Sequence, residues 1–326
     1  MGGVSRRTHS ATLPPDRFYC LLEELPLHLV PHRTLRSLRV REEQRPLFLN
    51  PECVFCSGDE IPRELADHSE LVSGFALQGT IAWIRKPPTG ECLPFWLGPK
   101  LESLLRSLDS NNPAPPLSAE LTALLTTAGI LISDTRVSER DEDSMMQSRR
   151  LFQEKGYAPR SNLIHPFHIA ALRRYYRYLI RTGAIALGDR QSSRRYFAHN
   201  EPVARFFHHQ MAATVSKVVG EPLKPSYVYF ASYLSGAELK KHCDREQCEF
   251  SVTLCLDFSP EPTLETQWPI RLDTATGTVA VYQALGDGLV YRGTQLPHYR
   301  DRLGEGQTST SMFFHYVGAD FEGSLD

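Results

Sequence analysis

Two hydrophobic periodicities divide the 326-residue chain. Between about residues 97 and 219, apolar residues recur every three or four positions, which is typical of amphipathic helices. After Pro225, apolar and polar residues alternate in short runs separated by turn residues, which is typical of antiparallel strands. The runs expected as strands are 226–234, 248–258, 269–272, 278–282, 288–291, 295–300 and 309–317. Many short strands after helices predict an α+β chain whose C-terminal part is an antiparallel barrel or jelly roll with supporting helices.

The first part of the chain has a different pattern. Short strand-like runs at 46–50, 70–79 and 80–86 precede a helical period that starts at Leu97. Ser118 is a candidate N-cap for a second helix that Gly129 ends, and a short strand follows at 130–133. This order predicts a small mixed unit that faintly resembles a winged helix.

The pattern predicts four regions along the chain. A polar, Pro-containing start indicates a flexible arm over residues 1–17, and the mixed N-terminal unit occupies 18–137. Both charge signs and no apolar period at 138–150 indicate a linker or the start of a solvated helix. Residues 151–326 form the helix-supported barrel.

Composition excludes several classes of protein. Lys and Arg number 36 against 38 Asp and Glu, so the net charge of −2 gives no general attraction for nucleic acid or anionic membranes. No apolar run approaches the ~20 residues that span a bilayer, and the first residues lack a signal-peptide core. Seven cysteines spread over the chain do not form a disulfide framework, which favours the cytoplasm. The pair Cys53 and Cys56 lacks a second ligand pair and is expected to pack as thiols.

The strongest chemical signal is a set of three candidate metal ligands. His242 and Asp244 are two residues apart in the sequence, so on an extended strand their side chains point the same way. His298 follows on a later strand. Two imidazoles and one carboxylate on one face of a metal leave the opposite face open, as in the facial triad of non-haem Fe(II) oxygenases.

The order of strand, His-x-Asp, strand, turn and distal His resembles the Fe(II)/2-oxoglutarate-dependent dioxygenases of the prolyl-hydroxylase type. Tyr233 and Gly236 resemble the Tyr-x-x-Gly that precedes the triad, and Gly286-Asp287 resembles the turn before the distal His. The resemblance is strong over residues 226–317, weak over 145–225, and absent from the N-terminal unit. It implies a double-stranded β-helix, Fe(II) and 2-oxoglutarate as cofactors, and ascorbate as a possible reductant.

The same resemblance calls for a cation that binds the far carboxylate of 2-oxoglutarate. In the prolyl-hydroxylase type it lies about ten residues after the distal His, but here that place, near Thr308, holds no cation. Arg300 is the better substitute, because it shares strand parity with His298, and Arg302 is the other candidate. An alternative is that both pair with nearby carboxylates at the rim. Side chains that offer further hydrogen bonds are Tyr233, Ser309 and Ser311.

The resemblance implies an enzyme that uses O₂ to hydroxylate an unactivated C–H bond and releases succinate and CO₂. The expected substrate is an amino-acid residue, free or in a peptide or protein, and no membrane or nucleic-acid partner is expected. The N-terminal unit would recruit a peptide, cover the barrel or form a homodimer. The alternative function is a non-catalytic metal- or ligand-binding protein on a cupin-like barrel. The histidines expected at caps or on the surface are His165, His168, His208 and His209.

Overall fold

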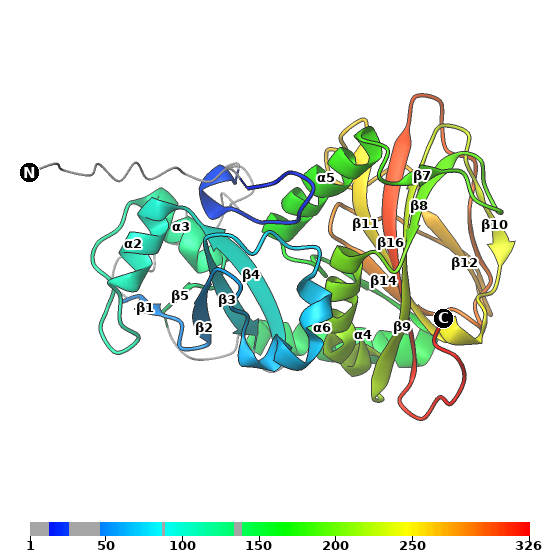
Figure 1. The fold of residues 1–326 in the computed structure, drawn as a ribbon. Helices are drawn as coiled ribbons and strands as arrows, with labels where there is room; N and C mark the ends of the chain where they lie inside the picture. Colours follow the sequence, from blue (N-terminus) through cyan, green and yellow to red (C-terminus); the bar gives the residue numbers. More distant parts are fainter. Residues whose placement is uncertain (1–12, 26–45, 87–88, 134–138) are drawn as a thin grey trace, which may run out of the picture.

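The computed structural model describes residues 13–25, 46–86, 89–133 and 139–326. Its C-terminal part contains two antiparallel sheets that stand opposite one another, as a jelly roll requires (Figure 1). The larger sheet has the order β6 (Tyr157–Arg160), β14 (Gly288–Arg292), β11 (Phe250–Ser259), β16 (Thr308–Gly318), β9 (Leu223–Tyr233), β8 (Arg195–His199) and β7 (Ala186–Leu187). The smaller has the order β10 (Leu239–His242), β15 (His298–Arg300), β12 (Ile270–Thr274) and β13 (Gly277–Val281).

Strand alternation gives the larger sheet two different faces. On β11, Val252 and Leu254 are buried in the main apolar core, which includes residues of the helices. Ser251 and Thr253 alternate with them and are also fully buried, so they face the interior of the jelly roll. These polar residues could form a binding site inside the jelly roll.

Three helices support the larger sheet on its outer face: α4 (Glu139–Lys155), α5 (Pro166–Arg181) and α6 (Pro202–Val219) (Figure 1). Glu201 caps α6 by accepting a hydrogen bond from the backbone N–H of Ala204 (3.0 Å). Gly220 ends the helix with a φ of 97°, a left-handed conformation that favours glycine. The predicted linker 138–150 is helical from Glu139, where α4 begins. This agrees with the alternative prediction for this segment, the start of a helix.

The N-terminal unit is a three-stranded meander, β2 (Cys53–Ser57), β3 (Thr80–Lys86) and β4 (Glu91–Leu97), followed by α2 (Pro99–Arg106) and α3 (Ala119–Thr127). A second small sheet pairs β1 (Phe48–Leu49) with β5 (Leu131–Ile132), and two 3₁₀ helices are η1 (Leu22–Glu24) and η4 (Arg63–Val72). The side chain of Ser118 caps α3 as predicted, accepting from the N–H of Leu121 (3.2 Å).

One prediction for this unit is wrong, and one strand was not predicted. The run 70–79 is not a strand: its first residues end η4, which buries Leu71 and Val72, and turns follow. The missing strand is β4, whose seven residues are all buried and pair with β3. Its continuous burial removes the polar–apolar alternation by which a strand is recognised. The winged-helix arrangement is not confirmed.

The N-terminal unit and the jelly roll share one apolar core. The ring centroids of Phe75 and Phe206 are 4.7 Å apart, and those of Phe18 and Phe207 are 5.7 Å apart. Figure 1 shows α5 and α6 between the meander and the larger sheet. Most of the predicted flexible arm, residues 1–12, lies outside the described residues. Among the described helices, none combines the length and the apolar character needed to cross a membrane.

Two histidines at the start of α5 join the two parts. His165 caps the helix, as predicted, by accepting from the N–H of Phe167 (3.1 Å). His168 was expected at a cap or on the surface, but it is fully buried, and its Nε2–H donates to the carbonyl of Pro94 in β4 (2.8 Å). Burial lowers the pKa of His165 to about 4 and that of His168 to about 3, so both stay neutral.

These buried histidines predict acid sensitivity. Their pKa values lie below the ~6.5 of an unfolded chain, so the unfolded state binds more protons below that pH. Each therefore removes up to about 1.4 kcal/mol per pH unit from the free energy of unfolding as the pH falls from ~6.5 towards 4. His168→Gln keeps a donor for the Pro94 carbonyl but cannot titrate. We expect this variant to lose about 2 kcal/mol less than the wild type between pH 7 and pH 5 in urea unfolding.

The control is a substitution at a residue that cannot titrate, Asn111→Gln in the exposed segment between α2 and α3. It should leave the pH dependence of the free energy of unfolding as it is in the wild type. An equal loss for His168→Gln and the wild type would contradict the prediction.

Candidate metal centre

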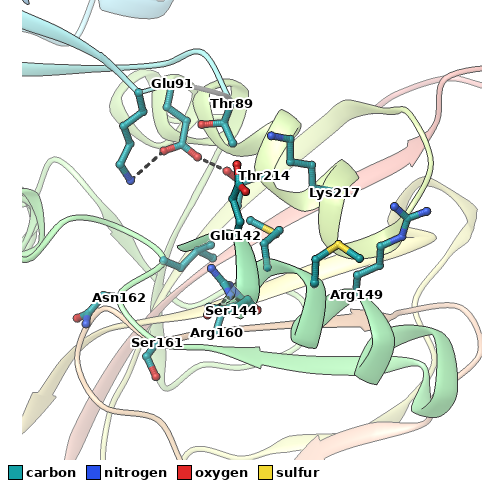
Figure 2. Close-up of a pocket in the computed structure, with 14 residues that line it drawn as sticks. Thr89, Glu91, Glu142, Ser144, Arg149, Arg160, Ser161, Asn162, Thr214 and Lys217 are labelled. Carbon is teal, nitrogen blue, oxygen red and sulfur yellow. Dashed lines mark hydrogen bonds and ion pairs between the residues drawn. The ribbon is translucent and has the colours of Figure 1, made fainter. Parts of the chain in front are cut away.

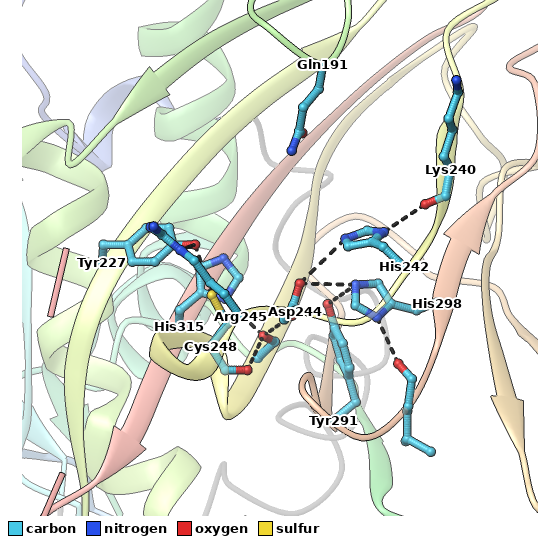
Figure 3. A network of polar contacts seen from close by, with 12 residues as sticks. Gln191, Tyr227, Lys240, His242, Asp244, Arg245, Cys248, Tyr291, His298 and His315 are labelled. Atoms are coloured by element: carbon cyan, nitrogen blue, oxygen red, sulfur yellow. Dashed lines mark hydrogen bonds and ion pairs between the residues drawn. The ribbon is translucent and has the colours of Figure 1, made fainter. Parts of the chain in front are cut away.

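The three predicted ligands converge beside β10, an edge strand of the smaller sheet, and its neighbour β15. Strand β10 pairs with β15 so that His242 stands directly opposite His298, and their ring centroids are 4.4 Å apart. Asp244 follows two residues after β10 ends, and its N–H donates to the carbonyl of Gly293 (2.9 Å). Figure 3 shows the three side chains directed at one another. The ligand atoms of the set lie within 4.8 Å of one another.

Backbone carbonyls fix the tautomer of both imidazoles. Nδ1 of His242 lies 2.7 Å from the carbonyl of Lys240, and Nδ1 of His298 lies 3.0 Å from that of Leu296. A carbonyl only accepts, so each Nδ1 carries the proton. Each Nε2 then presents its lone pair to the common point, 3.5 Å from Oδ1 of Asp244. This is the arrangement that a divalent metal needs.

The Asp244 carboxylate is held at its other oxygen. Ser251 donates from Oγ to Oδ2 (2.7 Å), and Nδ1 of His315 lies 2.9 Å from the same hydroxyl. A side chain at Gly293 would clash with Oδ2, so only glycine fits there. Burial would raise the pKa of Asp244, but where Nε2 of His242 and of His298 carries a proton, hydrogen bonds from these atoms outweigh burial and hold that pKa far below its usual range. A bound metal would take the place of these protons. The carboxylate is therefore charged and oriented.

A second set of possible ligands shares Asp244 with Cys248 and His315. Burial, the largest cause, raises the pKa of the Cys248 thiol to about 11, so it stays protonated and is a poor ligand. The thiol already lies 2.9 Å from the hydroxyl of Tyr227. Of the two sets, His242, Asp244 and His298 are therefore the better candidate ligands.

The structure places Arg300 inside the jelly roll, as strand parity predicted. Its side chain is 3% exposed, Nη1 donates to the carbonyl of Trp268 (2.5 Å), and Nη2 donates to Oε1 of Gln283 (3.2 Å). Burial lowers the pKa of this guanidinium. Among the described residues, no carboxylate lies within ion-pair distance of Arg300, whereas Arg302 is exposed and lies at the mouth of the site.

Among the described residues, several buried polar atoms of the strands that form the jelly roll have no hydrogen-bond partner. They are Nε of Arg300, Oγ of Ser311 and Oγ1 of Thr253. Tyr233 is 1% exposed and its hydroxyl accepts a hydrogen bond from Nη1 of Arg195 (3.3 Å), which leaves its own O–H free to donate. Unpaired buried polar groups are costly, so this cluster indicates a polar ligand.

Some site residues escaped sequence reasoning. Ser251 and His315 hold Asp244, the hydroxyl of Tyr291 lies 3.4 Å from Nε2 of His298, and Arg195 lines the entrance. Alternation was a signal for two of them: on β11 Ser251 and Thr253 alternate with apolar residues, and on β16 His315 shares one face with Ser309 and Ser311, interrupted by Phe313. The expectation for His208 is also corrected, because it is buried and bonds to the carbonyl of His315 (2.7 Å).

A cavity of about 620 Å³ lies away from these residues, between the β3–β4 hairpin, α4 and α6 (Figure 2). Its charges are mixed, because Lys86 and Lys217 stand beside Glu91 and Glu142. Lys86 and Thr214 already bind the carboxylate of Glu91. None of the three candidate ligands lines this cavity.

No protein-family model matches the sequence, and no curated protein matches it significantly. Solved structures are similar over about half of the chain. The non-heme alpha-ketoglutarate-dependent epimerase SnoN from nogalamycin biosynthesis is 13% identical with a TM-score of 0.46, over 55% of this chain and 82% of SnoN. A Pseudomonas putida prolyl-4-hydroxylase is 17% identical with a TM-score of 0.42, over 53% of this chain and 100% of its own.

HygX from Streptomyces hygroscopicus, solved with nickel, 2-oxoglutarate and hygromycin B, is 13% identical with a TM-score of 0.43, over 54% of this chain and 88% of its own. These structures are of the class that the sequence motifs resemble, the 2-oxoglutarate-dependent oxygenases. At these identities and TM-scores the likeness is distant, so the functional argument rests on the site itself.

The Ser251 contact generates a prediction about metal affinity. Ser251→Ala removes the hydrogen bond that orients Asp244 while leaving all three ligands in place. Loss of such a supporting contact typically weakens metal binding by about 10–100-fold. We expect a loss of this size for Mn(II) in calorimetric titration, and no measurable binding at this site for Asp244→Ala.

Cys243→Ser is the control, because Cys243 is exposed and takes no part in the ligand set. Its affinity for Mn(II) should equal that of the wild type. Unchanged affinity in Ser251→Ala would show that the serine does not orient the carboxylate.

Proposed function

We propose that this chain is an Fe(II)- and 2-oxoglutarate-dependent oxygenase that hydroxylates a C–H bond. The observation that carries the proposal is the pairing of two features in one barrel. A set of two histidines and one aspartate, His242, Asp244 and His298, lies at the open end, and an uncompensated buried cation, Arg300, lies in the same interior.

The three ligands fit a divalent iron. Both Nε2 lone pairs and Oδ1 of Asp244 are directed at one point, and the set supplies the single negative charge typical of this centre. Bound iron would supply the site at which O₂ is activated, with 2-oxoglutarate converted to succinate and CO₂. The part of the protein is to hold the ligand atoms in place: Lys240 and Leu296 orient the imidazoles, and Ser251 orients the carboxylate.

The interior also fits 2-oxoglutarate. Arg300 offers a planar fork that grips a carboxylate with two parallel hydrogen bonds, and its Nε–H has no partner. Tyr233 offers a hydroxyl in the same interior, and Ser311 and Thr253 offer unpartnered hydroxyls on one face of the larger sheet. Apolar side chains at Phe258 and Trp268 line the same interior and exclude water from the pair. Burial makes the charge-assisted contact stronger than it would be in water.

The proposed substrate is an amino-acid residue, free or within a peptide, on the resemblance of the motifs to the prolyl-hydroxylase type. The role proposed for the N-terminal unit is to cover the outer face of the jelly-roll helices, since the contacts of Phe75 and Phe18 with α6 support a shared core.

The decisive experiment is anaerobic addition of Fe(II) and 2-oxoglutarate to the purified chain. We expect a visible absorption band in the green region that needs both components, and O₂-dependent formation of succinate afterwards. A candidate substrate should gain sixteen mass units. A chain that binds Fe(II) without the band and forms no succinate would instead be a non-catalytic cupin-like protein.

Arg300 generates the second test of the proposal. Arg300→Ala deletes one partner of a desolvated charge-assisted pair, which costs about 2–5 kcal/mol, or at least a 30-fold loss of 2-oxoglutarate affinity. Arg300→Lys should recover only part of it, because an ammonium lacks the planar fork. Mn(II) affinity without 2-oxoglutarate should persist in both, since no ligand is changed.

The control is Arg271→Ala, because Arg271 lies on the neighbouring strand β12 and is paired with Asp301 on the outside (2.6 Å). It should bind 2-oxoglutarate as the wild type does. If Arg300→Ala retains wild-type affinity, the far carboxylate is held by another residue.

A further inference from the structure

The route into the metal centre passes His242. The side chains of the triad are 39% exposed at His242, 11% at Asp244 and 3% at His298, so the centre is open on the side of His242. A cavity of about 730 Å³ has His242 in its wall. Its volume falls within the ~300–1,000 Å³ typical of sites for small molecules.

The wall of this cavity is strongly basic. It contains five cationic side chains and one acidic side chain, Glu238. One of the five, Arg195, is neutralised by Asp189, whose Oδ2 accepts from Nε of Arg195 (2.6 Å). The other four, called here the basic rim, are Arg190, Arg194, Lys240 and Arg302. None of them has an ion-pair partner among the described residues.

Two of these cations, Arg194 and Arg302, lie close to Gly236. A Cβ on Gly236 would lie 3.1 Å from Nη1 of Arg194 and 3.3 Å from Nη2 of Arg302. The side chain of Arg194 donates one hydrogen bond, from Nη1 to the carbonyl of Ser235 (2.9 Å), and among the described residues its other guanidinium N–H groups have no hydrogen-bond partner. Like charges this close repel one another unless an anion lies between them. The whole chain has a net charge of −2, so this concentration of positive charge is local.

The loop that carries part of the basic rim is held in place. Oδ1 of Asp189 accepts from the N–H groups of Gln191 and Ser192, both at 2.8 Å, and Oδ2 accepts from the hydroxyl of Tyr229 (2.5 Å). Figure 3 shows Gln191, from the same loop, directed toward the triad. A loop fixed before binding loses little entropy when a ligand arrives.

We propose that the molecule oxidised here is a small anion whose carboxylate or phosphate group binds the basic rim. This inference rests on the proposed function, and it narrows the substrate class. Guanidinium forks bind both oxyanions with paired hydrogen bonds, and Lys240 adds a point charge beside His242. The anionic group would lie at the mouth, and the carbon to be oxidised would lie deeper, toward the triad.

The test measures binding of small probes to the full chain loaded with Mn(II) and saturating 2-oxoglutarate, so that the triad and Arg300 are already taken. The probes are phenyl phosphate, phenylacetate and uncharged benzyl alcohol, titrated by calorimetry. We expect at least one anion to bind, tenfold or more tightly than benzyl alcohol, and more weakly as the salt concentration rises. The tighter of the two anions identifies the group that the rim prefers.

Matched variants locate the site. Arg302→Gln and Lys240→Gln should each weaken binding of the anion by about tenfold or more. Lys241→Gln is the control, because Lys241 is the next residue but pairs with Asp273 (2.7 Å) away from the cavity. Thermal unfolding of all three should match the wild type, since these side chains are exposed.

The two proposals fail separately. If Mn(II) and 2-oxoglutarate bind but the anions bind no better than benzyl alcohol, or bind equally to Arg302→Gln and Lys240→Gln, the basic-rim inference is overturned. If the variants slow only the association of 2-oxoglutarate, the rim serves the cofactor and the inference is also overturned. If Mn(II) and 2-oxoglutarate do not bind while the anions bind at the rim, the oxygenase proposal fails and the anion site stands.

Discussion

The charged carboxylate of Asp244 imposes the constraint on which the surrounding structure depends. It is 11% exposed, and a buried charge is tolerated only where it is paired and hydrogen-bonded. Oδ2 is satisfied by Ser251, which in turn contacts His315, and Oδ1 faces the two imidazoles. Four strands or their ends must therefore meet at one place, which fixes the register of β10 on β15 and of β11 on β16.

A second buried charge lies in the same interior and has the opposite sign. Arg300 and Asp244 do not pair with each other in this structure. Two separate uncompensated sites, one for a cation and one for an anion, suit a ligand set of a divalent metal and a dicarboxylate. Keeping Arg300 buried without a carboxylate partner is unfavourable for the folded chain alone, which supports the proposal that this interior binds an anion.

The support for this interior comes from outside the barrel. Residues of the helix-facing side of β11 join α5 and α6, and these helices join the N-terminal meander through Phe75, Phe18 and His168. Because the core is continuous, displacement of α6 would be transmitted to β9, on which it packs, and so to the sheet that carries Tyr233.

The sequence by itself determined what depends on periodicity and on short spacing. Alternation after Pro225 predicted the jelly roll, the interval from His242 to Asp244 predicted the metal ligands, and parity with His298 predicted that Arg300 points inward. Each of these inferences depends on the geometry of one strand, which repeats every two residues, and the structure brings His242, Asp244 and His298 together and buries Arg300. The helix α6 could also be predicted from the sequence, because its apolar stripe and the glycine that ends it, Gly220, are local signals.

Only the tertiary structure decided which residues meet across elements. Ser251 and His315 lie 64 residues apart and reach Asp244 through strand pairing, and Arg194 meets Arg302 across Gly236. The strand β4 was missed because burial on both faces removes alternation, and His168 was misplaced because its partner, Pro94, lies in that missed strand. Contacts of this kind depend on how separate elements pack against one another. No local pattern in the sequence specifies which residues of two distant elements will be in contact.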